Sequence, residues 1–422
     1  MKYYIIAGEA SGDLHGSNLM KGIYSEDPQA DIRFWGGDLM LEVWDSWQNA
    51  APYDFNAAFS ASGISSKTAP SAKASQKLGA TGLVRHYKEG AVMGFVEVLA
   101  KAPKLLGNVR YCKKDILSWN PDVVILIDYP GFNFKIAEFA HKAGFKVFYY
   151  IAPKVWASRE SRIKKLKEYV DKLFIVFPFE KEYFESKGVD YVYCGNPLVD
   201  AVDTSKAMYE SKEEFLERCN LEMGPHIAML AGSRKGEIKK MMPVLTEFAA
   251  KLHSTAEYSD YKFLIAGAPS RSMKDYERFL TDEHKKYITV LFGETQAIIK
   301  NAEAAVVNSG TASLETVLFN TPQVVGYITN PITYLVAKSI IKIKYISLGN
   351  LIINKLAFKE YIQKECNSDA LIAEVKALIE NTEYRETMLQ DYAQIRDALG
   401  GSGASSAVAK AMIMELKRNG NE

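Results

Sequence analysis

The feature that most constrains the fold is an alternation of short apolar runs and helical patterns along the 422 residues. This alternation is typical of α/β proteins, in which helices connect the buried strands of a parallel sheet. In the first half, strands are expected at residues 3–7, 123–127, 147–151, 172–176 and 191–193. In the second half, they are expected at 227–230, 262–266, 288–291, 304–307 and 323–327. The two series predict two Rossmann-like, doubly wound domains that face each other across a cleft.

Residues 196–220 separate the two series and contain a proline followed by a charged, helix-like stretch. We place a hinge there and divide the chain into a domain at 1–198, a domain at 199–385 and a tail at 386–422. Helical patterns over 382–418 are interrupted at Gly400-Gly401-Ser402-Gly403. Ligands of open α/β sheets bind at the carboxyl ends of the strands, so the loops at those ends are the first candidates for a site.

Residues 41–76 interrupt the regular alternation, because they are rich in Ala and Ser and show no clear period. We interpret them as an inserted loop. Its aromatic residues are Trp44, Trp47, Tyr53, Phe55 and Phe59. Two alternatives remain open here, a surface excursion with some aromatic packing or an aromatic flap that touches lipid or acceptor.

Composition narrows the function classes. Lys+Arg 52 against Asp+Glu 51 gives a net charge of +1, which provides no global attraction for nucleic acid. The four cysteines are far apart and form no metal-binding or disulfide pattern, so no metal or cofactor is expected and a reducing cytoplasm suits them. We find no signal-peptide pattern and no apolar run of about 18 residues, so any membrane contact is expected to be peripheral.

Two loops of the first half carry candidate residues. The first strand runs into Gly8-Glu9-Ala10-Ser11-Gly12-Asp13, whose glycines allow close approach of a ligand to the backbone. Asp128 ends a buried strand and precedes a Pro-Gly turn. A carboxylate at this position can accept a proton from an acceptor hydroxyl, or it can simply stabilise the turn.

Two loops of the second half are suited to phosphate. Gly232-Ser233-Arg234 joins a strand to a helix, and a guanidinium there can bind phosphate oxygens with help from the helix dipole. Ser309-Gly310-Thr311-Ala312 offers a second cradle of small residues, and Glu315 follows one turn into its helix. Glu315 can accept hydrogen bonds from ribose hydroxyls, although an ordinary charge in a first helical turn gives the same pattern. Together the two loops favour a nucleotide diphosphate sugar.

The sequence resembles the lipid-A-disaccharide synthase family over nearly its whole length apart from residues 41–76. The likeness rests on ordered motifs in both halves of the chain. They are Gly8-Glu9-Ala10-Ser11-Gly12-Asp13, Gly36-Gly37, Met93-Gly94-Phe95, Ile127-Asp128 with Phe132-Asn133, Val155-Trp156-Ala157, Phe177-Pro178-Phe179-Glu180, Gly232-Ser233-Arg234, Ser309-Gly310-Thr311-Ala312 with Leu314-Glu315, and Lys344-Tyr345-Ile346-Ser347-Leu348.

This resemblance implies a GT-B fold in which the C-terminal helices return to the N-terminal domain. It also implies inverting transfer of diacylglucosamine from its UDP carrier to the 6-hydroxyl of 2,3-diacylglucosamine 1-phosphate. Asp128 is then the expected general base and Arg234 the clamp on the UDP phosphates. The other expected contacts to the substrates are Glu9, Ser11, Gly12, Asn133, Gly232, Ser233, Ser309, Gly310, Thr311, Ala312 and Glu315.

The same resemblance implies a cytoplasmic enzyme at the inner membrane surface, and members of the family can form homodimers that exchange carboxy-terminal segments. Residues 93–99 and 334–353 are candidate membrane-facing patches, although half-buried core elements would give the same pattern. Two other readings stay open. One is a different GT-B enzyme that uses UDP-sugars, such as a MurG-like transferase or a UDP-N-acetylglucosamine 2-epimerase. The other is a non-catalytic module that binds nucleotide sugars at a membrane.

Overall fold

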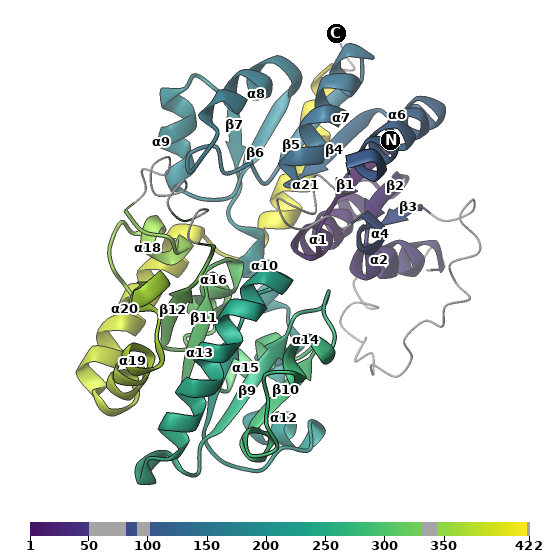
Figure 1. Cartoon of the computed structure of the whole chain (residues 1–422). Coiled ribbons are helices and arrows are strands. Elements are labelled where there is room, and N and C mark those ends of the chain that lie inside the picture. The colour runs from purple at the N-terminus through teal and green to yellow at the C-terminus, as the bar shows by residue number, and fades with distance from the viewer. Residues whose placement is uncertain (50–81, 91–101, 331–333, 335–343, 420–422) are drawn as a thin grey trace.

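The computed structural model describes residues 1–49, 82–90, 102–330, 334 and 344–419. Two parallel sheets, each flanked by helices, form the two halves of the molecule (Figure 1). The first sheet consists of β1 (Lys2–Ala7), β2 (Asp31–Gly36), β3 (Leu83–His86), β4 (Val123–Ile127), β5 (Lys146–Tyr150), β6 (Lys172–Ile175) and β7 (Tyr191–Tyr193). Its order, β3-β2-β1-β4-β5-β6-β7, changes direction between β1 and β4, which is where doubly wound sheets bind their ligands.

The second sheet repeats this design. It consists of β8 (His226–Leu230), β9 (Lys262–Gly267), β10 (Ile288–Phe292), β11 (Ala304–Asn308), β12 (Gln323–Tyr327) and β13 (Glu360–Ile362). The strand order β10-β9-β8-β11-β12-β13 places its own switch point between β8 and β11. The central strands β4 and β8 are buried along their full length, as their continuous apolar sequences predict. The predicted two-domain α/β architecture is confirmed.

Helices connect the strands in both halves. Those of the first half are α1 (Ala10–Glu26), α2 (Asp38–Asn49), α4 (Tyr87–Gly90), α6 (Ala102–Trp119), α7 (Pro130–Lys142), α8 (Ile163–Tyr169) and α9 (Phe179–Ser186). The linker contains α10 (Pro197–Asp203), α11 (Lys206–Tyr209) and α12 (Lys212–Arg218). The remaining helices are α13 (Lys235–His253), α14 (Lys274–Glu277), α15 (Thr295–Lys300), α16 (Thr311–Leu318), α18 (Leu348–Ile352), α19 (Ser368–Glu380), α20 (Thr382–Leu399) and α21 (Ala404–Asn419).

Each of the ten predicted strands is present, with ends that agree to within one residue. Three further strands, β2, β3 and β13, were not predicted. β2 was not recognised because a charged residue, Arg33, interrupts its apolar run. In the structure Asp115 neutralises this guanidinium through two hydrogen bonds, of 2.7 and 2.9 Å, so the charge is compatible with a strand. The other two strands have only 4 and 3 residues, too few for a period to be recognised.

The interpretation of residues 41–76 as an irregular loop was wrong at its start. Residues up to Asn49 belong to α2, which packs along α1. Trp47 stacks on Tyr24 with ring centroids 4.5 Å apart, and Val43 is buried beneath the helix. The aromatic residues at this end therefore belong to the core. The rest of the segment, with Tyr53, Phe55 and Phe59, lies outside the described residues.

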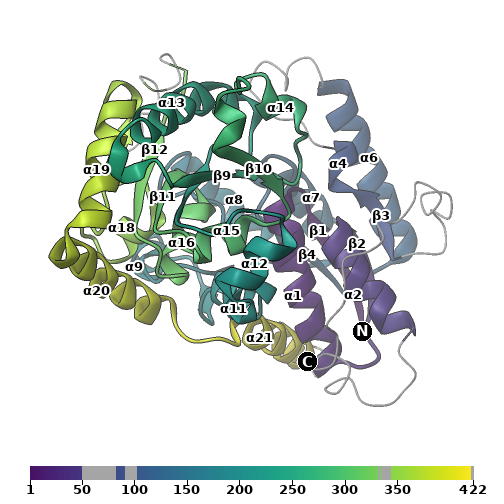
Figure 2. The ribbon, with the colours of Figure 1, turned by 90° about the horizontal axis from the view of Figure 1, so that it is seen from below.

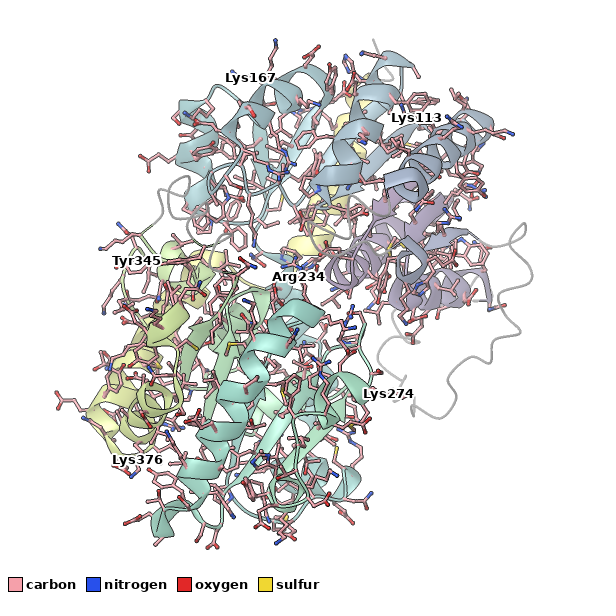
Figure 3. The ribbon with its side chains drawn as sticks, viewed as in Figure 1. Lys113, Lys167, Arg234, Lys274, Tyr345 and Lys376 are labelled. Atoms are coloured by element: carbon pink, nitrogen blue, oxygen red, sulfur yellow. The ribbon has the colours of Figure 1, made fainter. Side chains whose placement is uncertain are left out.

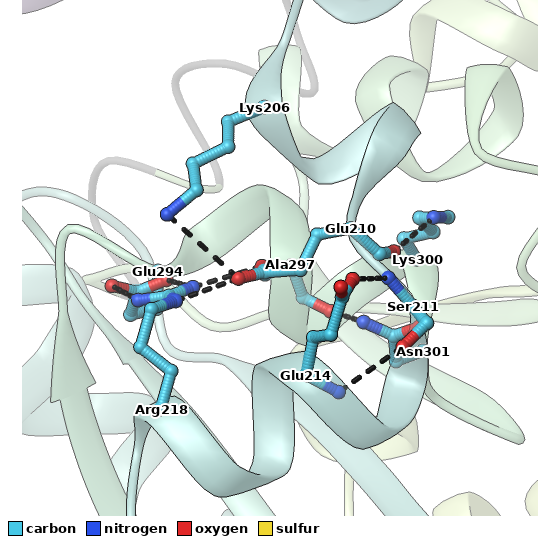
Figure 4. Close-up of polar contacts among 9 residues, drawn as sticks. All are labelled: Lys206, Glu210, Ser211, Glu214, Arg218, Glu294, Ala297, Lys300 and Asn301. Carbon is cyan, nitrogen blue, oxygen red and sulfur yellow. Dashed lines mark hydrogen bonds and ion pairs between the residues drawn. The ribbon is translucent and has the colours of Figure 1, made fainter. Parts of the chain in front are cut away.

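An ion-pair network attaches the linker between the two halves to the second domain (Figure 4). Arg218 at the end of α12 donates to Glu210 at 2.6 Å and to Glu294 at 2.6 Å. Lys300 of α15 donates to the backbone oxygen of Glu210 at 2.7 Å. Ser211 and Glu214 form a capping box at the start of α12. The predicted charged stretch is therefore helical and attached to α15 and its N-terminal loop.

The carboxy-terminal helices connect the two halves a second time. Helix α20 packs against α16, α18 and α19, whereas α21 packs along α1, as Figure 2 also shows. The return to the first domain therefore begins at Gly400, after α20, and not at residue 386, because the apolar face of α20 is buried on the second domain. Asp200 of α10 fixes this crossing, since its carboxylate accepts the backbone N–H groups of Gly403 at 2.5 Å and Ser405 at 2.7 Å.

Candidate active site

The loops at the carboxyl ends of β1 and β4 face the loops at the ends of β8 and β11. Figure 3 shows Arg234 at the edge of the second domain that is turned toward the first domain. The charge of Arg234 lowers the pKa of Asp128 from across this boundary, and the charge of Glu9 acts on both residues. Three of the predicted site residues, from two domains and three loops, therefore share one electrostatic environment.

Asp128 lies in a strained turn. Asp128 and the following Tyr129 have φ values of 43° and 45°, in the left-handed region that non-glycine residues seldom adopt. The backbone oxygen of Asp128 accepts hydrogen bonds from Asn133 at 2.8 Å and from the hydroxyl of Tyr149 at 2.6 Å. These two buried donors offset the strain and hold the carboxyl group at the end of β4.

Asn133 was predicted to contact the substrate, and the structure places it elsewhere. Its side chain is fully buried, and its amide donates to the backbone oxygens of Ile127 and Asp128. The residue is enclosed because it lies in the first turn of α7 beneath the strained turn. It therefore positions Asp128, and it cannot reach a ligand in the cleft.

The carboxyl group of Asp128 has an altered acidity. Burial raises its pKa from 3.8 to about 6, Lys154 and Arg234 counteract this, and Glu9 adds to it. Removing a carboxylate from water disfavours its charged form, so the group is a stronger base than an exposed aspartate. A base of this strength is close to what proton transfer near neutral pH requires.

The loop after β1 forms the neighbouring wall. Glu9 is the N-cap residue of α1 and is partly buried, whereas Ser11 is exposed. Gly12 lies so close to the sheet that an added Cβ would be 3.3 Å from the Cβ of Ala7. Asp13 was not assigned a role from sequence. It is buried and accepts the backbone N–H groups of Gly37 at 2.7 Å and Met40 at 3.1 Å, which fixes the start of α2.

The loop after β8 carries Arg234. Gly232 has a φ of 98°, and a Cβ there would come within 2.4 Å of the amide nitrogen of Asn308, so only glycine fits. The hydroxyl of Ser233 does not cap the following helix, whose N-cap residue is Arg234. The carboxylate of Glu237 instead accepts the N–H groups of Ser233 and Arg234, at 3.1 Å each.

The same carboxylate orients the predicted phosphate clamp. The guanidinium of Arg234 donates to Glu237 at 3.1 Å, and 56% of its side chain remains exposed. Burial opposes and Glu237 and Glu9 favour its charged form, with the result that its pKa is raised. Arg234 is therefore a permanent cation whose remaining donors are open to a ligand.

The loop after β11 lies beside the Arg234 loop, because Asn308 donates to the backbone oxygen of Ala231 at 3.1 Å. Ser309 and Gly310 are partly buried, Thr311 is exposed, and Ala312 is partly buried. Gly310 is the N-cap residue of α16. Glu315 accepts a hydrogen bond from Gln296 at 3.3 Å, and burial raises its pKa. Asn308 thus places this loop next to the loop of Gly232 and Arg234.

Sequence reasoning assigned no role to two carboxylates, Glu180 and Glu360, that hold backbone N–H groups in place. Glu180 is fully buried, accepts the indole N–H of Trp156 at 3.0 Å, and has a pKa raised to about 7 by burial. Glu360 accepts the backbone N–H groups of Ile346 and Ser347 at 2.9 Å each, and Ser309 donates to the oxygen of Ile346 at 3.4 Å. Only the motif that includes Glu180 had drawn attention to either carboxylate.

No group of three or more His, Cys, Asp or Glu side chains with metal-binding geometry occurs within the described part of the chain. None of the helices described in the structure has the length and apolar character required to cross a membrane.

Solved structures first define the class. The UDP-GlcNAc 2-epimerase from Neisseria meningitidis bound to UDP-GlcNAc matches with a TM-score of 0.63 at 13% identity, covering 98% of this chain and 100% of that chain. The Methanocaldococcus jannaschii UDP-GlcNAc 2-epimerase in complex with UDP-GlcNAc and UDP also gives 0.63, at 14% identity, covering 98% of this chain and 100% of that one. At such identities the likeness shows the fold alone, which is the two-domain GT-B fold.

Sequence comparison then defines the family within that class. The family model for lipid-A-disaccharide synthetase matches residues 73–413. The lipid-A-disaccharide synthase of Syntrophus aciditrophicus is 32% identical over 98% of both chains. The corresponding protein of Geobacter metallireducens is 32% identical over 98% of this chain and 96% of its own. This chain belongs to the lipid-A-disaccharide synthase family, a family of glycosyltransferases. The epimerase and the non-catalytic readings are not favoured.

Proposed function

We propose that this protein joins UDP-2,3-diacylglucosamine to 2,3-diacylglucosamine 1-phosphate, giving a β-1,6-linked disaccharide 1-phosphate and UDP. The observation that carries the proposal is the shared electrostatic environment of Asp128 and Arg234, which come from opposite domains. The relatives named lipid-A-disaccharide synthase support the choice of substrates.

The reaction requires two opposed tasks. The 6-hydroxyl oxygen of the acceptor attacks the anomeric carbon of the donor and forms the new C–O bond. Asp128 takes the hydroxyl proton, and its raised pKa makes it a competent base. The bond from the anomeric carbon to the diphosphate breaks at the same time, and its electron pair leaves with UDP. Attack from the face opposite to the leaving group inverts the anomeric centre.

The second domain is proposed to stabilise the departing UDP. Arg234 and the N–H groups at the start of α13 and α16 provide fixed donors for the growing charge on the diphosphate. Two of the N–H groups before α13, those of Ser233 and Arg234, donate to Glu237 in the structure. Ser309, Gly310, Thr311 and Ala312 would contact the pyrophosphate together with Gly232 and Ser233, and Glu315 would accept hydrogen bonds from the ribose. On the opposite wall, Glu9, Ser11 and Gly12 would contact the sugars.

A product assay tests the function. The purified chain is incubated with both lipids in detergent, and the products are separated by thin-layer chromatography. The expected result is a disaccharide phosphate that appears in step with UDP. If UDP-diacylglucosamine is instead epimerised in the absence of acceptor, or if nothing is released, the proposed function is wrong. Asp190→Asn is the matched control for variants of Asp128, because the side chain of Asp190 is 78% exposed in a surface ion pair with Lys172.

We also propose peripheral contact with the cytoplasmic face of the inner membrane. Residues 93–99 lie outside the described residues, as do residues 335–343 of the stretch 334–353. Support comes instead from α6, where Leu106 and Leu117 are 58% and 54% exposed and share the helix with the exposed Arg110 and Lys114. The wild type should sediment with anionic vesicles, whereas the double variant Leu106→Ser/Leu117→Ser should stay in the supernatant. Equal sedimentation of both proteins would contradict the proposal. The homodimer stays a prediction.

A further inference from the structure

A hollow of about 340 Å³, open space included, lies at the carboxyl ends of β1, β2 and β3. Its wall is formed mainly by apolar and aromatic side chains, among them Ile6, Trp35 and Phe132. Tyr129 and Gly8 also line it, so the hollow adjoins the strained turn that holds Asp128.

Arg85 supplies a positive charge to this hollow. Its guanidinium lies 5.7 Å from the ring centroid of Trp35 and 5.5 Å from that of Tyr111, and it donates to the buried Asn108. Two aromatic contacts and an amide hold the side chain in place, which lowers the entropy lost when it binds a ligand. The residue is thus preorganised on the wall of a mainly apolar hollow.

The charge of Arg85 is only weakly compensated. Its ion-pair partner in the described part of the chain is Glu89, at 3.5 Å and 57% exposed. The neighbouring His86 and Lys88 differ in this respect, because both contact Asp38, at 3.1 and 2.8 Å. Arg85 therefore retains donors for an anion, and a guanidinium binds phosphate oxygens through two parallel hydrogen bonds.

We propose that this hollow binds the anomeric phosphate end of the acceptor, with Arg85 donating to the phosphate oxygens. The ligand class that fits is an apolar sugar derivative carrying a phosphate. The aromatic wall contacts its apolar parts, and the phosphate lies against the guanidinium. A molecule held there has Tyr129 against it and therefore extends toward Asp128. This inference rests on the proposed function and names the part of the site that distinguishes acceptor from donor.

The test is a cycle in which protein and ligand are altered separately. KM is measured for the acceptor with and without its 1-phosphate, in wild type and in Arg85→Met. For the wild type, loss of the phosphate should raise KM about tenfold or more, as expected when a charged hydrogen bond is lost. For Arg85→Met, KM for the phosphorylated acceptor should rise by a similar factor. Removal of the phosphate should then have little further effect.

Two further variants make the outcome specific. Arg85→Lys should recover part of the affinity, because it keeps the charge. Arg278→Met is the matched control, since Arg278 is an exposed arginine with an aromatic contact, 4.6 Å from Phe279 on the second domain. An unchanged KM for the donor in Arg85→Met shows that the variant is folded.

Two results would overturn the inference. One is an unchanged KM of Arg85→Met for the phosphorylated acceptor. The other is a penalty for removing the phosphate that is as large in the variant as in wild type. A wild type that forms no disaccharide from either acceptor would instead reject the proposed function, and this inference with it. The two failures are therefore distinguishable.

Discussion

Replacing Asp128 by Asn should abolish most turnover and at the same time stabilise the first domain. The predicted loss of activity follows from its proposed role as the base, because general base catalysis contributes about 10²- to 10⁴-fold. The predicted gain in stability follows from burial. A carboxyl group whose pKa rises from 3.8 to about 6 on folding opposes folding by about 3 kcal/mol at neutral pH.

The sign and the pH range follow from the same two values. Above pH 6 the folded protein holds a charged carboxylate that would be more stable in water, so the penalty is fully present. It declines as the pH falls from about 6 to 3.8, and below 3.8 Asp128 is neutral in both states. Asn carries no charge and also tolerates the φ of 43° at this position. Asp128→Asn should therefore be more stable by up to about 3 kcal/mol at pH 7.5, and the gain should diminish toward pH 4.

Tryptophan fluorescence can measure the stability of the first domain, because all five tryptophans lie in the first 156 residues. Denaturant unfolding followed by fluorescence therefore reports on the domain that contains Asp128. Asp190→Asn, on the surface of the same domain, should change the unfolding free energy by less than about 0.5 kcal/mol. Near-normal turnover of Asp128→Asn would refute the assignment of the base. Equal or lower stability at pH 7.5 would refute the argument from burial.

Three further predictions concern the same cleft. Arg234→Ala should lower kcat about 100-fold or more, the usual effect of losing one fixed donor to a developing charge, and steady-state kinetics with saturating donor would measure it. Gly8→Ala should reduce kcat, because the added Cβ would come within 2.2 Å of the ring of Tyr129 and displace the strained turn; wild-type kcat would contradict this. The value of kcat/KM should fall below about pH 6, where Asp128 becomes protonated, and Glu9→Gln should move this limb to lower pH because the charge of Glu9 raises the pKa of Asp128.

The sequence predicted the parts of the molecule that depend on local patterns. Buried parallel strands such as β4 and β8 are continuous apolar runs, so their ends, and the polar residues that follow them, could be recognised directly. Asp128 and Arg234 were predicted as site residues in this way, and their roles stay predictions. Their proximity followed from the rule that ligands bind at strand ends, applied to two facing sheets.

What the sequence could not reveal depends on contacts between distant segments. β2 was missed because Arg33 makes its sequence look polar, and the residue that neutralises this charge, Asp115, is 82 positions away. Asn133 was predicted as a ligand contact because nothing local indicates that its amide is enclosed beneath the turn of Asp128. Arg85 was overlooked because its aromatic neighbours Trp35 and Tyr111 come from two other elements.

The proposed reaction needs both domains to be held in register. The proposed base and the cation that would stabilise the leaving group belong to separate sheets, so neither sheet contains the complete set of groups. Glu237 orients Arg234 within its own loop, which fixes the direction of the guanidinium before a substrate arrives. The distance between the sheets depends on the linker and on α21, whose start is held by Asp200. Since a displacement of about 1 Å can reduce a reaction rate 100-fold, these remote contacts contribute to catalysis through position alone.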